Sequence, residues 1–369
     1  MSAPLPPGPP PRPDARASVA ALRDFAERID VRTPAEFAED HLPGAVNLPV
    51  LDNAERARVG TIYAQVSAFD ARKVGAAIVA RNIARIVESH TGDKPREWRP
   101  LVYCWRGGQR SRSLVHVLCE IGWRAVQLDG GYRAYRRHVV ATLPLSCVRF
   151  SYRVVCGLTG SGKSRLLAAL AEAGAQVLDL EGIARHRGSL LGDVPGTAQP
   201  SQKWFESQLF DALGRLDGSR PVFVESESRR IGSVQMPDAL LLQMRIGRAL
   251  TLVTPLEQRV ALLKEEYAHF LSAPASLGAC LEPLVELHGK AAIARWAAMA
   301  AAADWNQLVA ELLETHYDPM YARSLARNFP SSRESLVIEA PDVSAHAFAT
   351  LASEVRAMLG AAETIASST

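Results

Sequence analysis

The sequence predicts an α/β protein with two domains, each built around a parallel β-sheet. Short apolar runs alternate along the chain with longer segments of helical periodicity, the pattern of a sheet covered by helices on both faces. Two of these runs, Leu101–Tyr103 and Phe150–Val155, lead into glycine-containing loops and then into helical patterns. The chain has 369 residues, 48% of them hydrophobic and 22% charged, which is enough for two globular cores.

The first domain is expected over residues 16–145. Residues 17–28 are expected to form a short helix. Thr33, Pro34 and Glu36 match a helix start, with Thr33 as N-cap and Glu36 completing a capping box. Further elements are a strand over Ala45–Leu48, a helical insertion over about 51–90, a strand over Arg124–Leu128 and a helix over Gly131–Leu143.

The second domain is expected over residues 146–360. Its predicted strands are Phe150–Val155, Gln176–Asp179, a run that ends at Glu225, Leu250–Val253 and Ser335–Glu339. Helices are predicted over 255–270 and 343–359, and a helical part over about 282–325. Trp296 and Trp305 lie in that helical part, where they fit a packed core better than a base-stacking surface.

Composition and chain ends exclude several classes of protein. The sequence contains no run of about 20 apolar residues, the length that a membrane-spanning helix needs. The proline-rich residues 1–15 lack the apolar centre of a signal peptide, so we expect a disordered tail there and a polar tail over 361–369. An odd number of irregularly spaced cysteines argues for a reducing cytoplasm and against disulfides or a zinc site; they are Cys104, Cys119, Cys147, Cys156 and Cys280.

Cys104 stands where chemistry is expected, at the carboxyl end of a strand and before a glycine-containing loop. Backbone N–H groups of the loop, the dipole of the following helix, Arg106 and Arg110 would favour the thiolate and would also bind an incoming anion. The alternative is a buried structural cysteine, which fits Cys119 inside the following helix better. Cys104 and Arg110 are separated by five residues, the C-x5-R spacing of a phosphate cradle.

Arginines concentrate around this loop although the net charge is only +3. Such a cluster indicates either a surface for a polyanion or an ordinary solvated basic face, and the sequence does not separate the two. Its members are Arg96, Arg99, Arg106, Arg110, Arg112, Arg124, Arg133, Arg136 and Arg137.

A second motif, G-x-x-x-x-G-K-S, lies between a predicted strand and a predicted helix. In this context it predicts a loop that wraps a di- or triphosphate, with Lys163 neutralising the terminal phosphates and Ser164 available to Mg²⁺. A plain glycine turn would not explain the Lys-Ser pair. The predicted phosphate-binding residues are Gly157, Thr159, Gly160, Ser161, Gly162, Lys163 and Ser164.

Two carboxylates could stand near this loop, since Asp179 and Glu225 each end a predicted strand. Glu225 is the candidate for the carboxylate near the metal. The alternative is that either residue only caps the following segment. Residues 186–189 and 202–206 mix polar and aromatic groups and fit either a pocket lining or plain surface.

Three segments resemble the rhodanese family. Asp30–Phe37 and His41–Pro49 resemble its opening, and Leu128–Tyr132 resembles its closing segment. The resemblance implies a rhodanese-like fold in which Cys104 carries sulfur or selenium as a persulfide or perselenide. The loop is longer than in many sulfur-transferring rhodaneses, and C-x5-R also occurs in cysteine-dependent phosphatases. The loop alone therefore leaves chalcogen transfer and phosphate ester hydrolysis open.

The two motifs together are more specific. CWRGGQRS followed by GLTGSGKS, with Val59–Tyr63 and His316–Pro319, resembles the bacterial tRNA 2-selenouridine synthase family over about residues 16–340. The resemblance implies a rhodanese-like domain followed by a P-loop NTPase-like domain. It also implies a transferase that replaces the sulfur of 2-thiouridine at the tRNA wobble position with selenium, after a geranyl group has been attached to that sulfur.

The same resemblance implies roles for the two sites. Cys104 would carry selenium as a perselenide, with Arg106 and Arg110 holding the phosphate of selenophosphate. The P-loop would hold the diphosphate of geranyl diphosphate, beside an apolar pocket that the sequence does not locate. tRNA is the expected partner, bound through the arginines; no covalent cofactor is expected.

Three other interpretations remain open from the residues. One is a cysteine-dependent phosphatase fused to a nucleotide-binding P-loop domain. Another is a nucleotide-dependent switch with an inactive rhodanese as binding module. The third is a sulfurtransferase that acts on another RNA or a carrier protein. Nucleotide binding, the identity of the tRNAs and the oligomeric state are not determined by the sequence.

Overall fold

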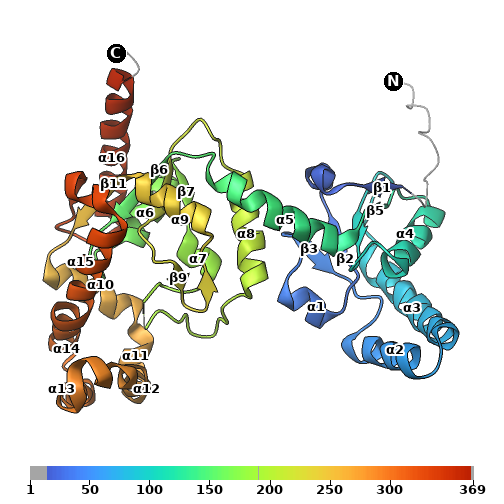
Figure 1. The fold of residues 1–369 in the computed structure, drawn as a ribbon, viewed down its shortest axis with the longest axis horizontal. Helices are drawn as coiled ribbons and strands as arrows, with labels where there is room; N and C mark the ends of the chain where they lie inside the picture. Colours follow the sequence, from blue (N-terminus) through green and yellow to red (C-terminus); the bar gives the residue numbers. More distant parts are fainter. Residues whose placement is uncertain (1–14, 190, 367–369) are drawn as a thin grey trace. The chain divides into compact units, whose positions relative to one another are not determined.

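Figure 1 shows the fold of the computed structural model, which describes residues 15–189 and 191–366. Contacts divide the chain into two compact units. The first contains the chain up to Leu143 together with Lys203–Asp211, and the second contains Pro144–Gln202 and the chain from Ala212 onward. The proline-rich tail expected over residues 1–15 lies outside the described residues up to residue 14.

A five-stranded parallel sheet in the order β1-β5-β4-β2-β3 forms the centre of the first unit. Its strands are β1 Arg16–Ala17, β2 Arg28–Asp30, β3 Ala45–Asn47, β4 Leu101–Tyr103 and β5 Val126–Leu128. Because the strands are parallel, their carboxyl ends lie at one edge of the sheet, and Cys104 follows β4 at that edge.

The helices of the first unit are the 3-10 helix η1 Val19–Asp24, α1 Pro34–Glu39, α2 Asn53–Gln65, α3 Ala68–His90, α4 Gln109–Ile121 and α5 Gly131–Cys147. The predicted capping box of α1 is confirmed, and the insertion forms α2 and α3. The predicted helix over 17–28 is wrong, because Arg16 and Ala17 pair with β5 as a strand and η1 follows.

The core of this unit lies between the sheet and helices α3 and α4. Ile83 of α3 and Leu114 and Leu118 of α4 pack with Ile29 of β2 and Val102 of β4. Fully burying one such side chain stabilises the fold by about 1.5–3 kcal/mol. Cys104 belongs to the same cluster, so the packed sheet fixes the position of its backbone.

The second unit also contains a five-stranded parallel sheet, in the order β12-β11-β6-β8-β7. Its strands are β6 Tyr152–Cys156, β7 Gln176–Leu178, β8 Val222–Glu225, β11 Arg248–Val253 and β12 Leu336–Glu339; β9 Arg230–Ile231 and β10 Val234–Gln235 form a separate antiparallel pair. Leu166 and Leu170 of α6 and Phe348 and Val355 of α16 pack on this sheet.

The helices of the second unit include α6 Lys163–Glu172, α7 Leu180–Ala184, α9 Asp238–Ile246, α10 Leu256–Glu266, α11 Ala268–Ser272, α12 Pro274–Leu281 and α16 Ala345–Ala366. Helix α8, Gln202–Gly214, contributes Lys203–Asp211 to the first unit. Helix α16 continues past residue 361, where a tail was expected, and residues 367–369 lie outside the described part of the chain.

The helical part contains α13 Val285–Ala301, α14 Trp305–Leu312, the π-helix η3 Leu313–Tyr317 and α15 Asp318–Asn328, with the 3-10 turns η2 Glu282–Leu284 and η4 Pro330–Glu334 at its ends. Trp296 is buried in its core and Trp305 packs against that core, which confirms their expected structural role. None of the described helices is both long and apolar enough to cross a membrane.

Candidate functional site

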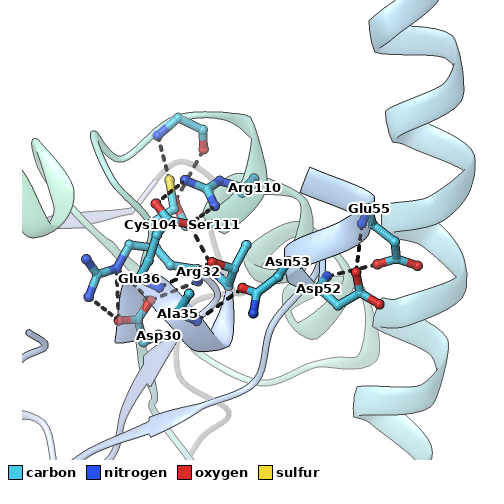
Figure 2. Close-up of polar contacts among 12 residues, drawn as sticks. Asp30, Arg32, Ala35, Glu36, Asp52, Asn53, Glu55, Cys104, Arg110 and Ser111 are labelled. Atoms are coloured by element: carbon cyan, nitrogen blue, oxygen red, sulfur yellow. Dashed lines mark hydrogen bonds and ion pairs between the residues drawn. The ribbon is translucent and has the colours of Figure 1, made fainter. Parts of the chain in front are cut away.

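The sulfur of Cys104 is held by two hydrogen-bond donors from the loop and helix that follow it (Figure 2). The backbone N–H of Gly108 lies 3.2 Å from Sγ, and the hydroxyl of Ser111 lies 3.1 Å from it. Cys104 is only 3% exposed, so these donors take the place of water around the sulfur. The side chain therefore faces the glycine loop and is not enclosed by hydrocarbon alone.

Gly107 is required by the shape of this loop. Its φ is +65°, and a Cβ there would stand 2.8 Å from the carbonyl oxygen of Leu128. The loop is tied to the start of α5 by two backbone hydrogen bonds, from Tyr132 N–H to Cys104 O and from Arg133 N–H to Trp105 O. These contacts hold the N–H of Gly108 in the direction of the sulfur.

Sequence reasoning missed Gln127, a buried residue of β5. Its side-chain amide donates to the hydroxyl oxygen of Ser111 at 2.7 Å and to the carbonyl oxygen of Gly108 at 3.0 Å. The Ser111 hydroxyl thus accepts from Gln127, and its own hydrogen has two acceptors within reach, the sulfur at 3.1 Å and the carbonyl oxygen of Gly108 at 3.3 Å. The available signal was a polar residue at the centre of an otherwise apolar strand.

Arg110 forms two hydrogen bonds with the carboxylate of Glu36, at 2.8 and 3.2 Å. Burial raises the pKa of Glu36, but the hydrogen bonds and charge of Arg110 outweigh this and hold it below its ordinary value. Glu36 also accepts from the N–H of Thr33 in the α1 capping box. The guanidinium expected to hold phosphate is thus already oriented by a carboxylate, whereas Arg106 is exposed.

The arginine cluster is only partly available to a polyanion. Arg110 is paired with Glu36, and Arg136 with Glu206 of α8. The remaining members are exposed; they are Arg96, Arg99, Arg106, Arg112, Arg124, Arg133 and Arg137.

In the second unit the G-x-x-x-x-G-K-S segment joins β6 to α6, as predicted. Lys163 is buried, with Nζ 3.3 Å from the Glu225 carboxylate, and the Ser164 hydroxyl donates to Glu225 at 3.1 Å. Burial lowers the pKa of Lys163, but the surrounding acidic groups, with Tyr321 first among them, raise it above its ordinary value. The lysine therefore stays charged. Gly157, Thr159, Gly160, Ser161 and Gly162 form the loop itself.

Asp179 does not face this loop, because its carboxylate caps α7 by accepting from the N–H of Gly182 at 2.8 Å. The carboxylate beside Ser164 is Glu181, at 3.2 Å, together with Glu225. Glu227 completes a group of three whose oxygens lie within 4.8 Å of one another. Burial and the charge of Glu225 raise the pKa values of Glu181 and Glu227.

A hard divalent cation fits this set of groups, since the oxygens of three carboxylates and a hydroxyl lie close together beside the ammonium of Lys163, which pairs with Glu225. Ser164, Glu181, Glu225 and Glu227 would hold it.

A cavity of about 460 Å³ lies over the P-loop. Thr159, Lys163 and Ser164 line it from the loop, and the segment Arg187–Ser189 lines another wall. In the other mixed segment, 202–206, the residues from Lys203 onward belong to the first unit, where Trp204 stacks on His41 with 3.8 Å between ring centroids. Gln202 bonds to Gln235 in the second unit.

A second cavity, of about 70 Å³, adjoins the first and is almost entirely apolar. Five residues line both cavities: Thr159, Ser189, Leu263, Tyr267 and Tyr317. The remaining walls come mainly from α10, α11, α12 and α14, including Phe270, Leu277, Trp305, Leu308, Val309 and Leu312. The helical part of the chain thus places an apolar chamber directly beside the phosphate-binding loop.

The segment His316–Pro319 links this helical part to the P-loop. Asp318 binds Arg259 at 2.5 and 3.0 Å, and Arg259 donates to the carbonyl oxygen of Thr159 at 2.9 Å. His316 lines the P-loop cavity and lies within the π-helix η3. Such helices often occur at functional sites.

Comparison with known proteins agrees with both halves of the structure. The rhodanese-like domain family matches residues 17–138, and the family described as the tRNA 2-selenouridine synthase AAA domain matches residues 150–279. These two regions correspond to the Cys104 loop with its sheet and to the P-loop with its sheet.

Curated proteins named tRNA 2-selenouridine synthase are similar to this chain. The Nitrosomonas europaea protein is 37% identical over 250 residues, 65% of this chain and 63% of the relative. The Hydrogenovibrio crunogenus protein is 38% identical over 65% of this chain and 67% of the relative. The Cupriavidus necator protein is 37% identical over 71% of each chain. This chain therefore belongs to the tRNA 2-selenouridine synthase family.

Proposed function

We propose that this protein replaces the sulfur of 2-thiouridine at the tRNA wobble position with selenium from selenophosphate, after transferring a geranyl group from geranyl diphosphate to that sulfur. The observation that carries the proposal is the presence, in one chain of this family, of a sulfur held by two donors and a P-loop beside an apolar chamber. Because the substrate is tRNA, we place the reaction in the cytoplasm.

The order of the two steps follows from leaving-group chemistry. In 2-thiouridine the sulfur at C2 would have to leave as sulfide. After geranylation it can leave as a thiolate. The P-loop site would therefore act first, and the Cys104 site second. No nucleotide hydrolysis is needed for either step.

For the first step, the P-loop amides and Lys163 would hold the diphosphate, and the adjoining 70 Å³ chamber would take the start of the geranyl chain. Tyr267 and Tyr317 stand where the two cavities meet, which is where C1 of the donor would lie. The thiouridine sulfur attacks C1, the C1–O bond breaks, and diphosphate leaves. A magnesium ion at Ser164 and the three glutamates would neutralise the diphosphate charge when bound.

For the second step, Cys104 would be the reactive group and would carry the selenium as a perselenide. Forming a perselenide on Cys104 requires a change of oxidation state. Selenium in a perselenide is more oxidised than in selenophosphate, so forming the S–Se bond from a thiolate needs a two-electron oxidant, which none of the proposed substrates supplies.

A route without an oxidant is also compatible with the loop. Selenium of selenophosphate would attack C2 of the base and expel the geranyl thiolate, which leaves a phosphoryl group on selenium. Cys104 Sγ would then accept that phosphoryl group, and water would release it as phosphate. The C-x5-R spacing fits this second role, since Arg106, Arg110 and the loop amides would hold the oxygens of the phosphoryl group while it is bound to Cys104.

The test uses the full-length protein with tRNA that contains 2-thiouridine, geranyl diphosphate and selenophosphate, and measures the modified nucleosides by mass spectrometry. Lys163→Ala is expected to lose geranylation while still selenating tRNA that is already geranylated. Cys104→Ser is expected to accumulate geranylated tRNA without selenium. Wild-type rates of selenation in Cys104→Ser, or of geranylation in Lys163→Ala, would overturn the proposal.

The role of Cys104 is resolved by labelling. Selenophosphate labelled on selenium would leave its label on the protein if a perselenide forms. Selenophosphate labelled on phosphorus would leave its label on the protein if the cysteine accepts the phosphoryl group. A label that is found on the wild-type protein but not on Cys104→Ser was bound to the sulfur of Cys104.

A further inference from the structure

A groove of about 1260 Å³ lies between α2, α3 and α4 of the first unit. Most of its lining comes from the insertion that forms α2 and α3, and the rest comes from the first half of α4. All of its lining residues belong to the first unit, and Arg110 is the one among them that the proposed reactions use.

The α3 side of the groove, called its floor here, is apolar and combines Val79, Ile83 and Val87 with small residues; the small ones are Ala68, Ala71, Gly75, Ala76, Ala80 and Ala84. Charge on the lining is mostly positive. Arg56, Arg72, Arg110 and Arg112 line the groove, and Glu88 is the one acidic residue among its lining. Tyr63, from α2, also lines it and is 65% exposed.

One end of the groove adjoins the Cys104 loop. Gln109 and Arg110, the first two residues of α4, line the groove, and the preceding residue, Gly108, donates its N–H to Cys104 Sγ. A base that reaches the sulfur would therefore carry its neighbouring nucleotides close to this end.

We propose that the groove binds the anticodon loop of the tRNA, with unstacked bases over the α3 floor and Tyr63, and with backbone phosphates at Arg56, Arg72 and Arg112. This inference rests on the proposed function, because that function puts the reacting base in the anticodon loop. Single-stranded RNA is recognised by this combination of apolar or aromatic surface for bases and arginines for phosphates. The insertion that forms α2 and α3 thereby acquires a role as the RNA-binding element of the first unit.

A protein helix is the other occupant that a floor of small residues could admit. The surplus of arginines over acidic residues favours RNA, since each nucleotide brings a phosphate. The neighbouring helix positions provide a matched control: Arg58 of α2 and Arg81 of α3 are exposed on the same two helices but do not line the groove.

The test measures binding of full-length protein to a fluorescent anticodon stem-loop RNA with 2-thiouridine at the wobble position. Arg56→Glu with Arg72→Glu is expected to weaken binding about tenfold or more and to reduce the dependence of log affinity on log salt by about 1–2. Arg58→Glu with Arg81→Glu carries the same change in charge and is expected to change affinity by less than about threefold. Tyr63→Ala is expected to weaken binding about fivefold or more with the salt dependence unchanged.

Equal effects of the two double variants would overturn the inference, because they would show a general charge effect. Unchanged RNA affinity in Arg56→Glu with Arg72→Glu would also overturn the inference and would favour a protein helix as the occupant of the groove. The proposed function is judged separately, by selenium incorporation in wild type and its loss in Cys104→Ser. If the groove variants bind RNA as wild type does while wild type still incorporates selenium, only the proposal of RNA binding in the groove is rejected.

Discussion

The Cys104 loop and the P-loop share one local design and differ in their charge. Each follows a central strand of a parallel sheet and precedes a helix, and each depends on glycines at positive φ. At the P-loop, a buried lysine lies among three carboxylates. At the cysteine loop the two donors to the sulfur are neutral, and Arg110 is paired with Glu36. The P-loop site therefore suits a diphosphate accompanied by a cation, and the cysteine loop suits a reacting atom that must stay nucleophilic.

If the Cys104 loop and the P-loop act independently, a backbone change in one loop should leave the reaction proposed for the other loop intact. Gly107→Ala forces a side chain into φ +65° and against Leu128 O. We expect selenation to fall about 100-fold or more and the first unit to lose about 2 kcal/mol of stability, while geranylation persists. Nucleoside mass spectrometry and thermal melting measure these effects.

Gly108→Ala is the matched control, since a Cβ there meets nothing within 4 Å. Comparable losses in the two alanine variants, or loss of geranylation in Gly107→Ala, would show that the two loops are not separable in this way.

The donors to the sulfur can be tested next. Ser111→Ala removes the 3.1 Å hydrogen bond to Cys104 and deprives the Gln127 amide of one acceptor. We expect selenation to slow about 10- to 100-fold and alkylation of Cys104 by iodoacetamide at neutral pH to slow as well. In Ser113→Ala, which removes a hydroxyl bonded only to Gln109 O, both rates should stay at the wild-type level.

The apolar chamber provides the converse test at the P-loop. Val309→Trp would fill the 70 Å³ cavity, so KM for geranyl diphosphate should rise about tenfold while tRNA that already carries the geranyl group is selenated normally. Steady-state kinetics with each substrate measures the two effects. An unchanged KM for geranyl diphosphate would remove the chamber from the donor site.

The smallest expected effect concerns Glu36, whose pKa lies below its ordinary value of 4.5 because of Arg110. A lowered folded-state pKa contributes stability above the unfolded-state value, and that contribution is lost as pH falls through the folded-state value. Glu36→Gln keeps the capping box but loses the charge, so it should cost about 1 kcal/mol at pH 7. The difference from wild type should shrink below pH 4.5, as denaturant titrations at several pH values would show; a difference independent of pH would contradict this.

Sequence reasoning succeeded where the signal is local. The capping box of Thr33 and Glu36, the strand before Cys104 and the strand–loop–helix around Lys163 each depend on residues within a few positions of one another. It failed for β1, whose two residues become a strand only by pairing with β5, more than a hundred positions away. For Asp179 the sequence left two roles open, because capping α7 and standing near the P-loop are equally compatible with a position after a strand; the structure shows the cap.

From the order of its residues alone, this chain specifies two strand–loop–helix segments, one with Cys104 and one with the G-x-x-x-x-G-K-S motif, because short-range backbone geometry and capping encode them. The partners of those sites depend on folding: Glu36 at Arg110, Gln127 at Ser111, Glu181 at Ser164 and the chamber beside the P-loop. Parallel sheets bring together strand ends that are far apart in the chain, and only their spatial order determines which side chains meet.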